Sequence, residues 1–514
     1  MNPDRLLARL PLPATLFLSA FSGVLVVLSL PKPDFYYLGW LALVPMFLAL
    51  SFDRPKLETF AVGYAAGLTY FAGTFYWIAR TMSTYGGLSG GLSLAVFFLF
   101  VVVFAGHVGL FALLLRAVLN RFGLAGLVLA APIWVGIELL QTYWIFGGFP
   151  WMLVGYALAP YGGLLQIVTW TGIYGLSFVL VTVNAAVAFG LRSARWEVVA
   201  AAVAMVVAAT FIPAPQNKQS GDTLAVRLVQ TNIDLDQSWL EPDEAELLDE
   251  LHRLSTSGRA RPELIVWPET PAPFFLEQDP EISKRMRAIA AEADSHFLLG
   301  YIGRIDQAVS NSAALLTPSG EQASRYDKIH LVPFGEYVPL KDLLFFAESL
   351  VRNVGDFTPG SEFTISPIDG HRISTTICYE DVFPSLMRQF TLRGAELIVN
   401  ITNDGWFGTT SAPYQHLRMA RVRAVENRRS IVKVANTGIT AIIDPYGRIV
   451  ARTELGERTT LEGRPGYRSD LTPYVRFGDV FAYVVTLVAV VGLVVAWRGQ
   501  GRESKVQSPR SEVG

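Results

Sequence analysis

Apolar runs, each about as long as a membrane-spanning helix, constrain what this chain can fold into. A helix needs roughly 20 apolar residues to cross the hydrocarbon core of a bilayer. Such runs lie near residues 12–30, 35–52, 60–79, 92–115, 124–143, 164–191, 198–212 and 480–497. Only 17% of the 514 residues are charged, and mean hydropathy is +0.36, which is typical of a membrane protein. The sequence therefore predicts an α-helical membrane bundle of about eight transmembrane helices.

Cations in the short loops predict the orientation of this bundle, because Lys and Arg accumulate in cytoplasmic loops. With eight spans, five groups of cations fall on one side: Arg5 and Arg9, Arg54 and Lys56, Arg116 and Arg121, Arg192 and Arg195, and Arg498, Arg502, Lys505 and Arg510. The opposite short loops carry only Lys32 and Arg80. We therefore expect both termini in the cytoplasm and the long segment before the eighth run on the outer side.

That long segment has the composition of an α/β domain. Helix-length stretches such as 281–294 and 413–427 separate short β-branched runs that predict strands. These runs lie at 225–229, 264–267, 373–377, 397–401, 430–434 and 440–443. We expect spans one to seven at 1–212, a linker at 213–223, an α/β sandwich at 224–477, the eighth span at 478–497 and a cytoplasmic tail at 498–514.

Composition also limits the function. The chain has 42 basic and 44 acidic residues, so its net charge of -2 gives no sign of a nucleic-acid partner. Cys378 is its one cysteine, which excludes an intramolecular disulfide and a cysteine-based metal site. The six histidines lack the spacing of a zinc motif. We expect neither a metal nor a cofactor.

Three segments place reactive side chains where a predicted strand ends. They are Ile265-Val-Trp-Pro-Glu269, the segment from Tyr326-Asp-Lys328 to Glu336, and Ile377-Cys378-Tyr379-Glu380-Asp381. α/β folds assemble active sites at strand ends, because the sheet holds the backbone while side chains emerge into a crevice. A carboxylate, an ammonium group and a thiol can supply the base, the oxyanion donor and the nucleophile of acyl transfer.

These residues resemble the Glu-Lys-Cys triad of the nitrilase superfamily, and their flanks resemble the apolipoprotein N-acyltransferase family. The resemblance covers nearly the whole chain. It extends to Gly147–Trp151, Gln230-Thr-Asn232 with Trp239, Asn403-Asp-Gly-Trp-Phe-Gly408, Arg423-Ala-Val-Glu426-Asn and Ala435-Asn-Thr-Gly-Ile439. One departure is Gln141, where the resemblance implies an arginine shortly after Glu138. The implied fold of the outer domain is a nitrilase-like αββα sandwich.

The resemblance also implies a role for each site residue. Glu269 is expected as general base, Lys328 as oxyanion stabiliser and Cys378 as nucleophile. The backbone N–H of Tyr379 is expected to complete the oxyanion hole. Directly behind the triad we expect Glu336 and Glu380. Contacts with substrate or lipid are expected at Trp151, Trp239, Trp406 and Phe407.

The implied reaction is the last step of lipoprotein maturation at the outer face of a bacterial inner membrane. An acyl chain moves from a membrane phospholipid to Cys378 as a thioester, and then to the α-amino group of a diacylglyceryl-cysteine at the N-terminus of an apolipoprotein. The expected partners are therefore a phospholipid donor, a diacylglyceryl apolipoprotein acceptor and the lipids of the membrane. We expect a monomer.

Two other functions stay open on the residues alone. A membrane-tethered amidase would use the same triad with water as acceptor, but a single anchor would suffice for it. A transporter or lipid-binding protein with an inactive outer domain would not need Glu269, Lys328 and Cys378 together. Charged residues are also scarce inside the spans, which disfavours a transporter.

Single residues also have plainer interpretations. A lone cysteine is usually a small buried hydrophobe, but an unpaired thiol is a poor structural choice in an oxidising compartment. A Cys-His dyad with His330 is disfavoured, because the flanking Ile329 and Leu331 predict a packed histidine. Within the spans we expect His107 and Glu138 to form structural hydrogen bonds between helices.

Overall fold

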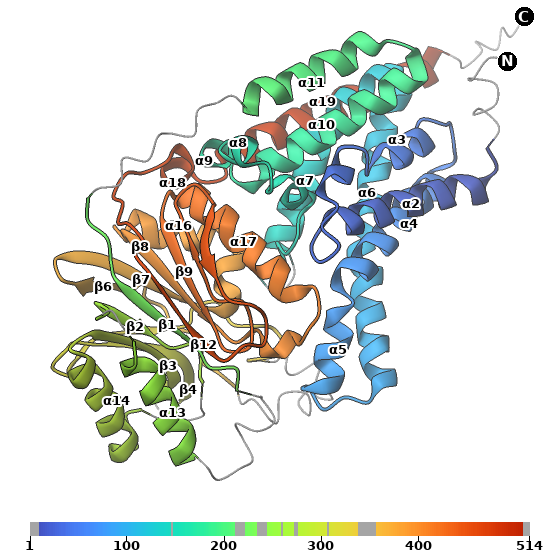
Figure 1. Cartoon of the computed structure of the whole chain (residues 1–514). Helices are drawn as coiled ribbons and strands as arrows, with labels where there is room; N and C mark the ends of the chain where they lie inside the picture. Colours follow the sequence, from blue (N-terminus) through green and yellow to red (C-terminus); the bar gives the residue numbers. More distant parts are fainter. Residues whose placement is uncertain are drawn as a thin grey trace, which may run out of the picture. The chain divides into compact units, whose positions relative to one another are not determined.

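The chain folds into two compact units (Figure 1). The computed structural model describes residues 10–144, 147–210, 221–233, 244–258, 261–271, 276–305, 308–337 and 356–506. The first unit comprises Met1–Tyr76, Leu94–Ile212 and Asp479–Gly514, and the second comprises Trp77–Ser93 and Pro213–Gly478. The expected division at residue 212 placed residues 77–93 in the bundle, whereas by its contacts this segment belongs to the second unit.

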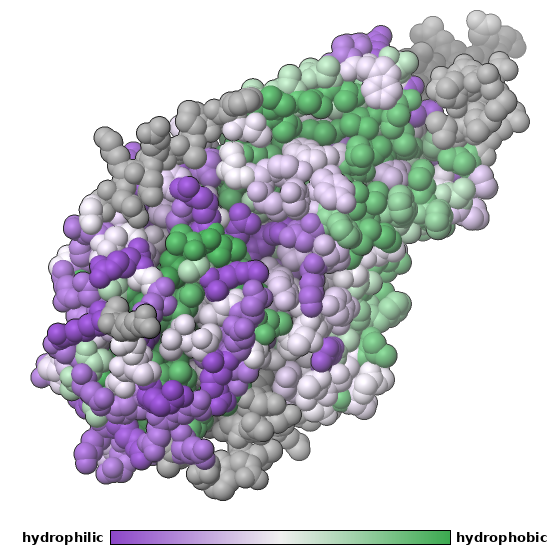
Figure 2. Space-filling model, viewed as in Figure 1, coloured by the Kyte–Doolittle hydropathy of each residue, from purple (hydrophilic) through white to green (hydrophobic). Residues whose placement is uncertain are grey.

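The first unit is made of apolar helices, and Figure 2 shows apolar residues covering much of its visible surface. A helix that faces lipid can keep apolar side chains on its surface, because hydrocarbon, unlike water, does not oppose the exposure of apolar groups. The helices are α2 (Leu12–Ser29), η1 (Tyr36–Trp40), α3 (Val44–Leu50), α4 (Lys56–Phe75), α6 (Gly90–Phe122), η2 (Gly123–Leu129), α7 (Ala130–Tyr143), η3 (Val154–Leu158), α8 (Gly162–Leu165), α9 (Val168–Thr171), α10 (Ile173–Ser193), α11 (Trp196–Thr210) and α19 (Val480–Val506).

Among the described residues, four helical stretches are long and apolar enough to cross a bilayer: Leu12–Ser29, Gly90–Tyr143, Ile173–Ser193 and Val480–Arg498. The second of them has 54 residues and contains two of the expected spans. Gly123, with φ +59°, separates α6 from the helices that follow. Each of the expected apolar runs contains helix, and a total of eight spans stays a prediction.

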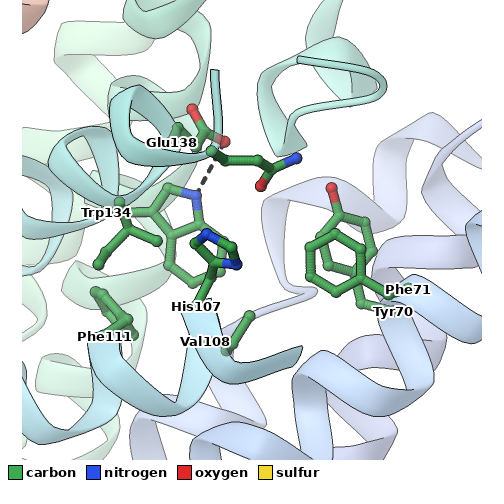
Figure 3. A pocket seen from close by; sticks show the side chains of 9 residues that line it. Tyr70, Phe71, His107, Val108, Phe111, Trp134 and Glu138 are labelled. Atoms are coloured by element: carbon green, nitrogen blue, oxygen red, sulfur yellow. Dashed lines mark hydrogen bonds between the residues drawn. The ribbon is translucent and has the colours of Figure 1, made fainter. Parts of the chain in front are cut away.

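The ionisable side chains of His107 and Glu138 lie inside the first unit, and Figure 3 shows the hydrogen bond between Trp134 and Glu138. Glu138 on α7 accepts hydrogen bonds from Trp134 Nε1 at 3.0 Å and from the N–H of Val154 at 3.1 Å, which ties α7 to η3. His107 Nδ1 lies 3.1 Å from the carbonyl oxygen of Phe104 on its own helix. Glu138 thus makes the kind of contact expected of it, whereas the hydrogen bond of His107 stays within α6.

The second unit is the expected αββα sandwich, and its described residues form two sheets of six strands each. The first sheet has the order β12-β1-β2-β3-β4-β5 and the second the order β11-β10-β9-β8-β7-β6. In the first lie β1 (Val226–Gln230), β2 (Leu264–Val266), β3 (His296–Ile305), β4 (Ala308–Leu316), β5 (Gln322–Asp327) and β12 (Thr459–Gly463). In the second lie β6 (Ile365–Ile368), β7 (His371–Ile377), β8 (Leu397–Thr402), β9 (Ser430–Ala435), β10 (Ala441–Ile443) and β11 (Ile449–Arg452).

A pair of helices covers each sheet (Figure 1). On the first sheet, α13 (Glu244–Thr256) and α14 (Pro280–Ala293) enclose a core that includes Trp267 and Met286. On the second, α16 (Pro384–Leu392) and α17 (Ala412–Asn427) enclose Met387 and Ile431. β1, β2 and β3 run parallel to one another, as do β7, β8 and β9. The carboxyl ends of the strands in each parallel set therefore meet at one edge.

Candidate active site

The three predicted triad side chains each follow a strand. Glu269 lies three residues after β2, Lys328 directly follows β5, and Cys378 follows β7 as the first residue of the short helix η5 (Cys378–Val382). β2 and β5 belong to the first sheet and β7 to the second. The site therefore draws on both sheets, and the described structure brings the three residues together.

Lys328 is buried between two carboxylates. Its Nζ lies 2.9 Å from Glu336 Oε1 and 3.3 Å from Glu269 Oε1, and the residue is 1% exposed. Burial alone would lower the pKa of this ammonium group, but the charges of Glu336 and Glu269 outweigh it and raise the pKa above its ordinary value. Lys328 therefore stays a cation and can hold a developing negative charge.

Glu269 is held by neutral donors as well as by the lysine. Asn311 Nδ2, from β4, donates to Glu269 Oε1 at 2.7 Å and to Glu336 Oε1 at 2.8 Å. The backbone N–H of Asn403 donates to Glu269 Oε2 at 2.8 Å. Sequence reasoning missed Asn311, and the available signal was an amide side chain in the middle of a strand whose other residues are small or apolar.

Cys378 has an unusual backbone and a protonated thiol. Its φ of +52° lies in the left-handed region, which residues with a Cβ seldom adopt. Burial and the negative charge of Glu269 raise the pKa of the thiol well above its usual value, while Lys328 and a hydrogen bond with Thr402 act to lower it. The resting thiol is therefore neutral, and a base must remove its proton before it can attack a carbonyl group.

Glu380 connects the lysine segment to the cysteine segment through backbone. Its Oε1 accepts the N–H groups of Ile329 at 2.7 Å and His330 at 3.1 Å, and its Oε2 accepts that of Ile377 at 2.8 Å. Burial raises the pKa of this carboxyl group to about 7, against the opposing effect of these donors. Glu380 thus fixes how β7 and the turn after β5 lie against each other.

Two aromatic residues that follow the nucleophile, Tyr379 and Phe383, pack against the ring of His330. The ring of His330 lies 3.7 Å from that of Phe383 and 5.8 Å from that of Tyr379. Burial, together with the charge of Lys328, lowers the pKa of His330 to about 4. His330 is thus a neutral packed ring at pH 7, which agrees with the expectation from its flanks.

The loop after β8 carries two of the predicted contact residues. Trp406 and Phe407 lie in η6 (Asp404–Phe407) and are half-buried. Both residues contact α5 (Trp77–Thr84). The centroid of the Phe407 ring lies 5.0 Å from that of the Trp77 ring. The hydroxyl of Thr81 also donates to the carbonyl oxygen of Trp406 at 2.9 Å. These two aromatic residues therefore hold a second segment of the chain against the loop.

Two further predicted contact residues lie elsewhere. Trp151 is 1% exposed within the helical unit, where its ring stacks with that of Phe149. Trp239 lies outside the described residues. Within the described ranges, no group of three or more His, Cys, Asp or Glu side chains could hold a metal ion.

The site can be compared with known proteins. Residues 22–186 match the apolipoprotein N-acyltransferase N-terminal domain, and residues 225–464 match the carbon-nitrogen hydrolase family. The apolipoprotein N-acyltransferase of Geobacter metallireducens is 37% identical over 94% of this chain and 95% of its own length. That of Methylococcus capsulatus is 32% identical over 91% and 94%. A solved structure of Nit3 from Saccharomyces cerevisiae is 19% identical, with a TM-score of 0.38 over 48% of this chain and 90% of its own.

The relatives match this chain over nearly its whole length, and the two family models match successive parts of it. Apolar helices precede a carbon-nitrogen hydrolase domain that contains a glutamate, a lysine and a cysteine at strand ends. The chain therefore belongs to the apolipoprotein N-acyltransferase family.

Proposed function

We propose that this protein moves a fatty-acyl chain from a membrane phospholipid to the α-amino group of the N-terminal diacylglyceryl-cysteine of apolipoproteins, through a thioester on Cys378. The observation that carries the proposal is the buried thiol of Cys378 beside a buried ion pair of Glu269 and Lys328. This combination supplies what a covalent acyl transfer needs: a nucleophile, a base and a fixed cation. The apolar helical unit gives a reason why the acyl donor is a lipid.

In the first half of the reaction Glu269 removes the proton from Cys378 Sγ, and the thiolate attacks the carbonyl carbon of the lipid ester. Lys328 Nζ and the backbone N–H of Tyr379 stabilise the oxyanion of the tetrahedral intermediate. When this intermediate collapses, the ester C–O bond breaks and the lysophospholipid alkoxide takes the proton from Glu269. The acyl group remains on sulfur.

In the second half the free amine of the apolipoprotein attacks the thioester. Glu269 accepts a proton from the amine, the C–S bond breaks, and Cys378 leaves as a thiolate that Lys328 stabilises by its charge. Protonation of the thiolate by Glu269 returns the enzyme to its resting state. Water must stay out of the site during this half, since it would compete with the amine for the thioester.

The location we propose is the periplasmic face of the inner membrane, with both termini in the cytoplasm and the enzyme acting as a monomer. The asymmetric distribution of Lys and Arg among the short loops supports this orientation. The apolar surface of the helical unit supports residence in a bilayer (Figure 2).

Mass spectrometry of the purified protein tests the thioester. Protein supplied with phospholipid but no amine should gain the mass of one fatty-acyl group, which hydroxylamine should remove. Glu269→Gln should load slowly or not at all, because only a few per cent of even an ordinary thiol is ionised at pH 7. Lys328→Ala should lose about a hundredfold to a thousandfold in loading rate. Full activity of Cys378→Ala would refute the proposal.

Addition of a lipopeptide distinguishes the acyltransferase from an amidase. A diacylated lipopeptide with a free N-terminal amine should discharge the labelled enzyme and form an amide, whereas its N-acetylated counterpart should not. Loss of the label to water at one rate, with or without the lipopeptide, would favour a membrane-tethered hydrolase instead.

A further inference from the structure

A cluster of four buried charged residues lies near the nucleophile and is not used in the mechanism above. Asp381, Asp404, His416 and Lys433 are each at most 1% exposed. His416 Nε2 lies 2.6 Å from Asp381 Oδ1, and its Nδ1 lies 2.9 Å from Asp404 Oδ1. Lys433 Nζ lies 3.2 Å and 3.3 Å from the same two ring nitrogens. Burial and the charge of Lys433 oppose protonation of the ring, but the two carboxylates outweigh them and raise the pKa of His416 to about 9, so the ring is an imidazolium cation at pH 7. The cluster therefore contains two anions and two cations.

One connection runs from this cluster to the backbone of Cys378. Lys433 Nζ donates to Asp381 Oδ2 at 3.1 Å and to Asn400 Oδ1 at 2.8 Å. This second bond fixes which way the amide of Asn400 points. Its Nδ2 then donates to the carbonyl oxygen of Cys378 at 3.3 Å and to Thr376 Oγ1 at 3.1 Å.

A second connection reaches the thiol. The hydroxyl of Thr402, at the end of β8, donates to Asp404 Oδ1 at 2.9 Å. The same hydroxyl acts to lower the pKa of the Cys378 thiol. A hydroxyl has one proton and two lone pairs. While its proton is on Asp404, it can accept the S–H proton, and rotation lets it donate to the thiolate instead. In both arrangements Asp404 also accepts the hydrogen bond from His416 Nδ1.

The backbone of Cys378 explains why such support is needed. A non-glycine residue with positive φ persists only where the surrounding structure fixes it from several sides. Asn400 holds its carbonyl group and Thr402 its side chain, and both are oriented by the same charged cluster. Stability alone is a weak reason for the cluster, because buried ion pairs often add little net free energy over an apolar core.

We propose that Asp381, Asp404, His416 and Lys433 form a positioning unit that holds the Cys378 nucleophile through Asn400 and Thr402. This inference rests on the proposed role of Cys378 as nucleophile. The four residues touch neither substrate nor the oxyanion. They act by fixing the backbone of Cys378 and by offering its thiolate a hydrogen-bond donor.

The Thr402 hydroxyl is tested by a matched pair of variants, Thr402→Val and Thr402→Ser. Valine keeps the shape but removes the hydroxyl, so the pH at which iodoacetamide alkylates Cys378 should rise. Acyl loading should fall by about tenfold, the effect of one hydrogen bond to a charged group. The KM for phospholipid should stay unchanged. Serine retains the hydroxyl and should behave like the wild type in both assays.

The cluster itself is tested with Lys433→Met, which removes the cation that orients Asn400. The control is Arg423→Met, because Arg423 and Glu426 form another fully buried ion pair, with Nε and Oε2 3.1 Å apart, in the same unit. Both substitutions should lower the thermal midpoint. Lys433→Met should in addition lower the acyl-loading rate and alter the alkylation profile of Cys378, whereas Arg423→Met should change neither.

The outcomes separate this inference from the proposed function. Wild-type loading and alkylation in a folded Thr402→Val protein would overturn the positioning role, as would a Lys433→Met protein that differs from Arg423→Met in neither assay. The proposed function would survive both results, provided that Cys378→Ala is inactive. Activity of Cys378→Ala would overturn the two together.

Discussion

The two carboxylates beside Lys328 have the same kinds of partner and differ in their distance from the ammonium group. Glu336 Oε1 meets Lys328 and Asn311, and its Oε2 accepts the N–H of Val332 at 2.8 Å. Glu269 likewise meets Lys328, Asn311 and one backbone N–H, that of Asn403. Glu269 has a weaker contact with the ammonium group, at 3.3 Å, which suits the residue that has to accept a proton.

Glu336 is accordingly expected to matter more for turnover than for folding. Glu336→Ala removes the nearer of the two anions that hold Lys328, so the ammonium group loses its fixed position. Acyl loading should fall by about a hundredfold or more, because oxyanion donors act only when correctly placed. Single-turnover loading measures the rate, and circular dichroism checks the fold. Wild-type loading in a folded variant would exclude this role, and the exposed Glu362→Ala serves as control.

The imidazolium of His416 should also appear in the pH dependence of stability. Burial and the charge of Lys433 oppose its protonation, but Asp381 and Asp404 outweigh them and raise its pKa to about 9 from an ordinary value of 6.5. A raised pKa in the folded state adds stability that is complete below pH 6.5 and is lost as the pH rises through 9.

Thermal unfolding between pH 6 and 10 measures this contribution. The midpoint of the wild type should fall between pH 6.5 and 9, and that of His416→Gln should start lower and fall less steeply. Equal slopes in the wild type and in His416→Gln would contradict the assignment.

Sequence alone could predict that Glu269, Lys328 and Cys378 lie together, but not the residues that hold them. Glu269, Lys328 and Cys378 each follow a strand pattern and lie in a recognisable motif, so their meeting could be expected. Asn311 and Lys433 lie inside strands, and their partners come from distant segments and adjacent strands. Such contacts depend on strand order and register, which local patterns do not contain.

At the scale of elements, α5 shows how a segment between two apolar runs joins the catalytic unit. Trp77 Nε1 donates to Gln415 Oε1 on α17 at 3.2 Å, and its ring packs against Phe407. The same loop provides the Asn403 N–H that binds Glu269. A hydropathy pattern predicts where a helix runs but not which unit it contacts, which is why residues 77–93 were expected in the bundle.

Loosening α5 should therefore slow catalysis from a distance. Trp77→Ala removes a large ring from the contact with Phe407 and should lower acyl loading by roughly tenfold, through the position of Asn403 and thus of Glu269. Trp77→Phe keeps most of the ring contact and should lose much less. Loading rates of the two variants give the comparison. Equal rates in Trp77→Ala and the wild type would show that the η6 loop does not depend on α5.

On the scale of the whole molecule, three arginines of the helical unit, Arg54, Arg116 and Arg192, lie close to one another. Arg54 Nη2 donates to the carbonyl oxygen of Leu10 at 2.6 Å, and Arg116 Nη1 donates to that of Phe52 at 3.1 Å. The guanidinium group of Arg192 lies 4.9 Å from the ring of Phe52. These cations come from three of the five groups that the sequence assigns to the cytoplasmic side, and Leu10 directly follows the first group. Their proximity supports a common side of the membrane for all four segments.

The orientation of the second unit then depends on α11, which is the shortest of the expected spans. Its 15 residues extend about 22 Å, less than the roughly 30 Å of a hydrocarbon core. Arg192 and Arg195 precede it, and the second unit follows it. If α11, with the residues that flank it, crosses the bilayer, the catalytic unit faces the periplasm. If it lies along the surface, the catalytic unit stays on the side of those cations.

Reporter fusions on the two sides of α11 decide between these cases. Alkaline phosphatase, which is active only in the periplasm, should be inactive when fused after Ser193 and active when fused after Asp222. A fluorescent reporter that folds only in the cytoplasm should give the reverse pattern, which guards against a fusion that is merely degraded. The reason is the positive charge before α11 and the absence of Lys and Arg within it. Cytoplasmic signals from both positions would place Cys378 in a reducing compartment, and the proposed acceptor at the outer face would then be out of its reach.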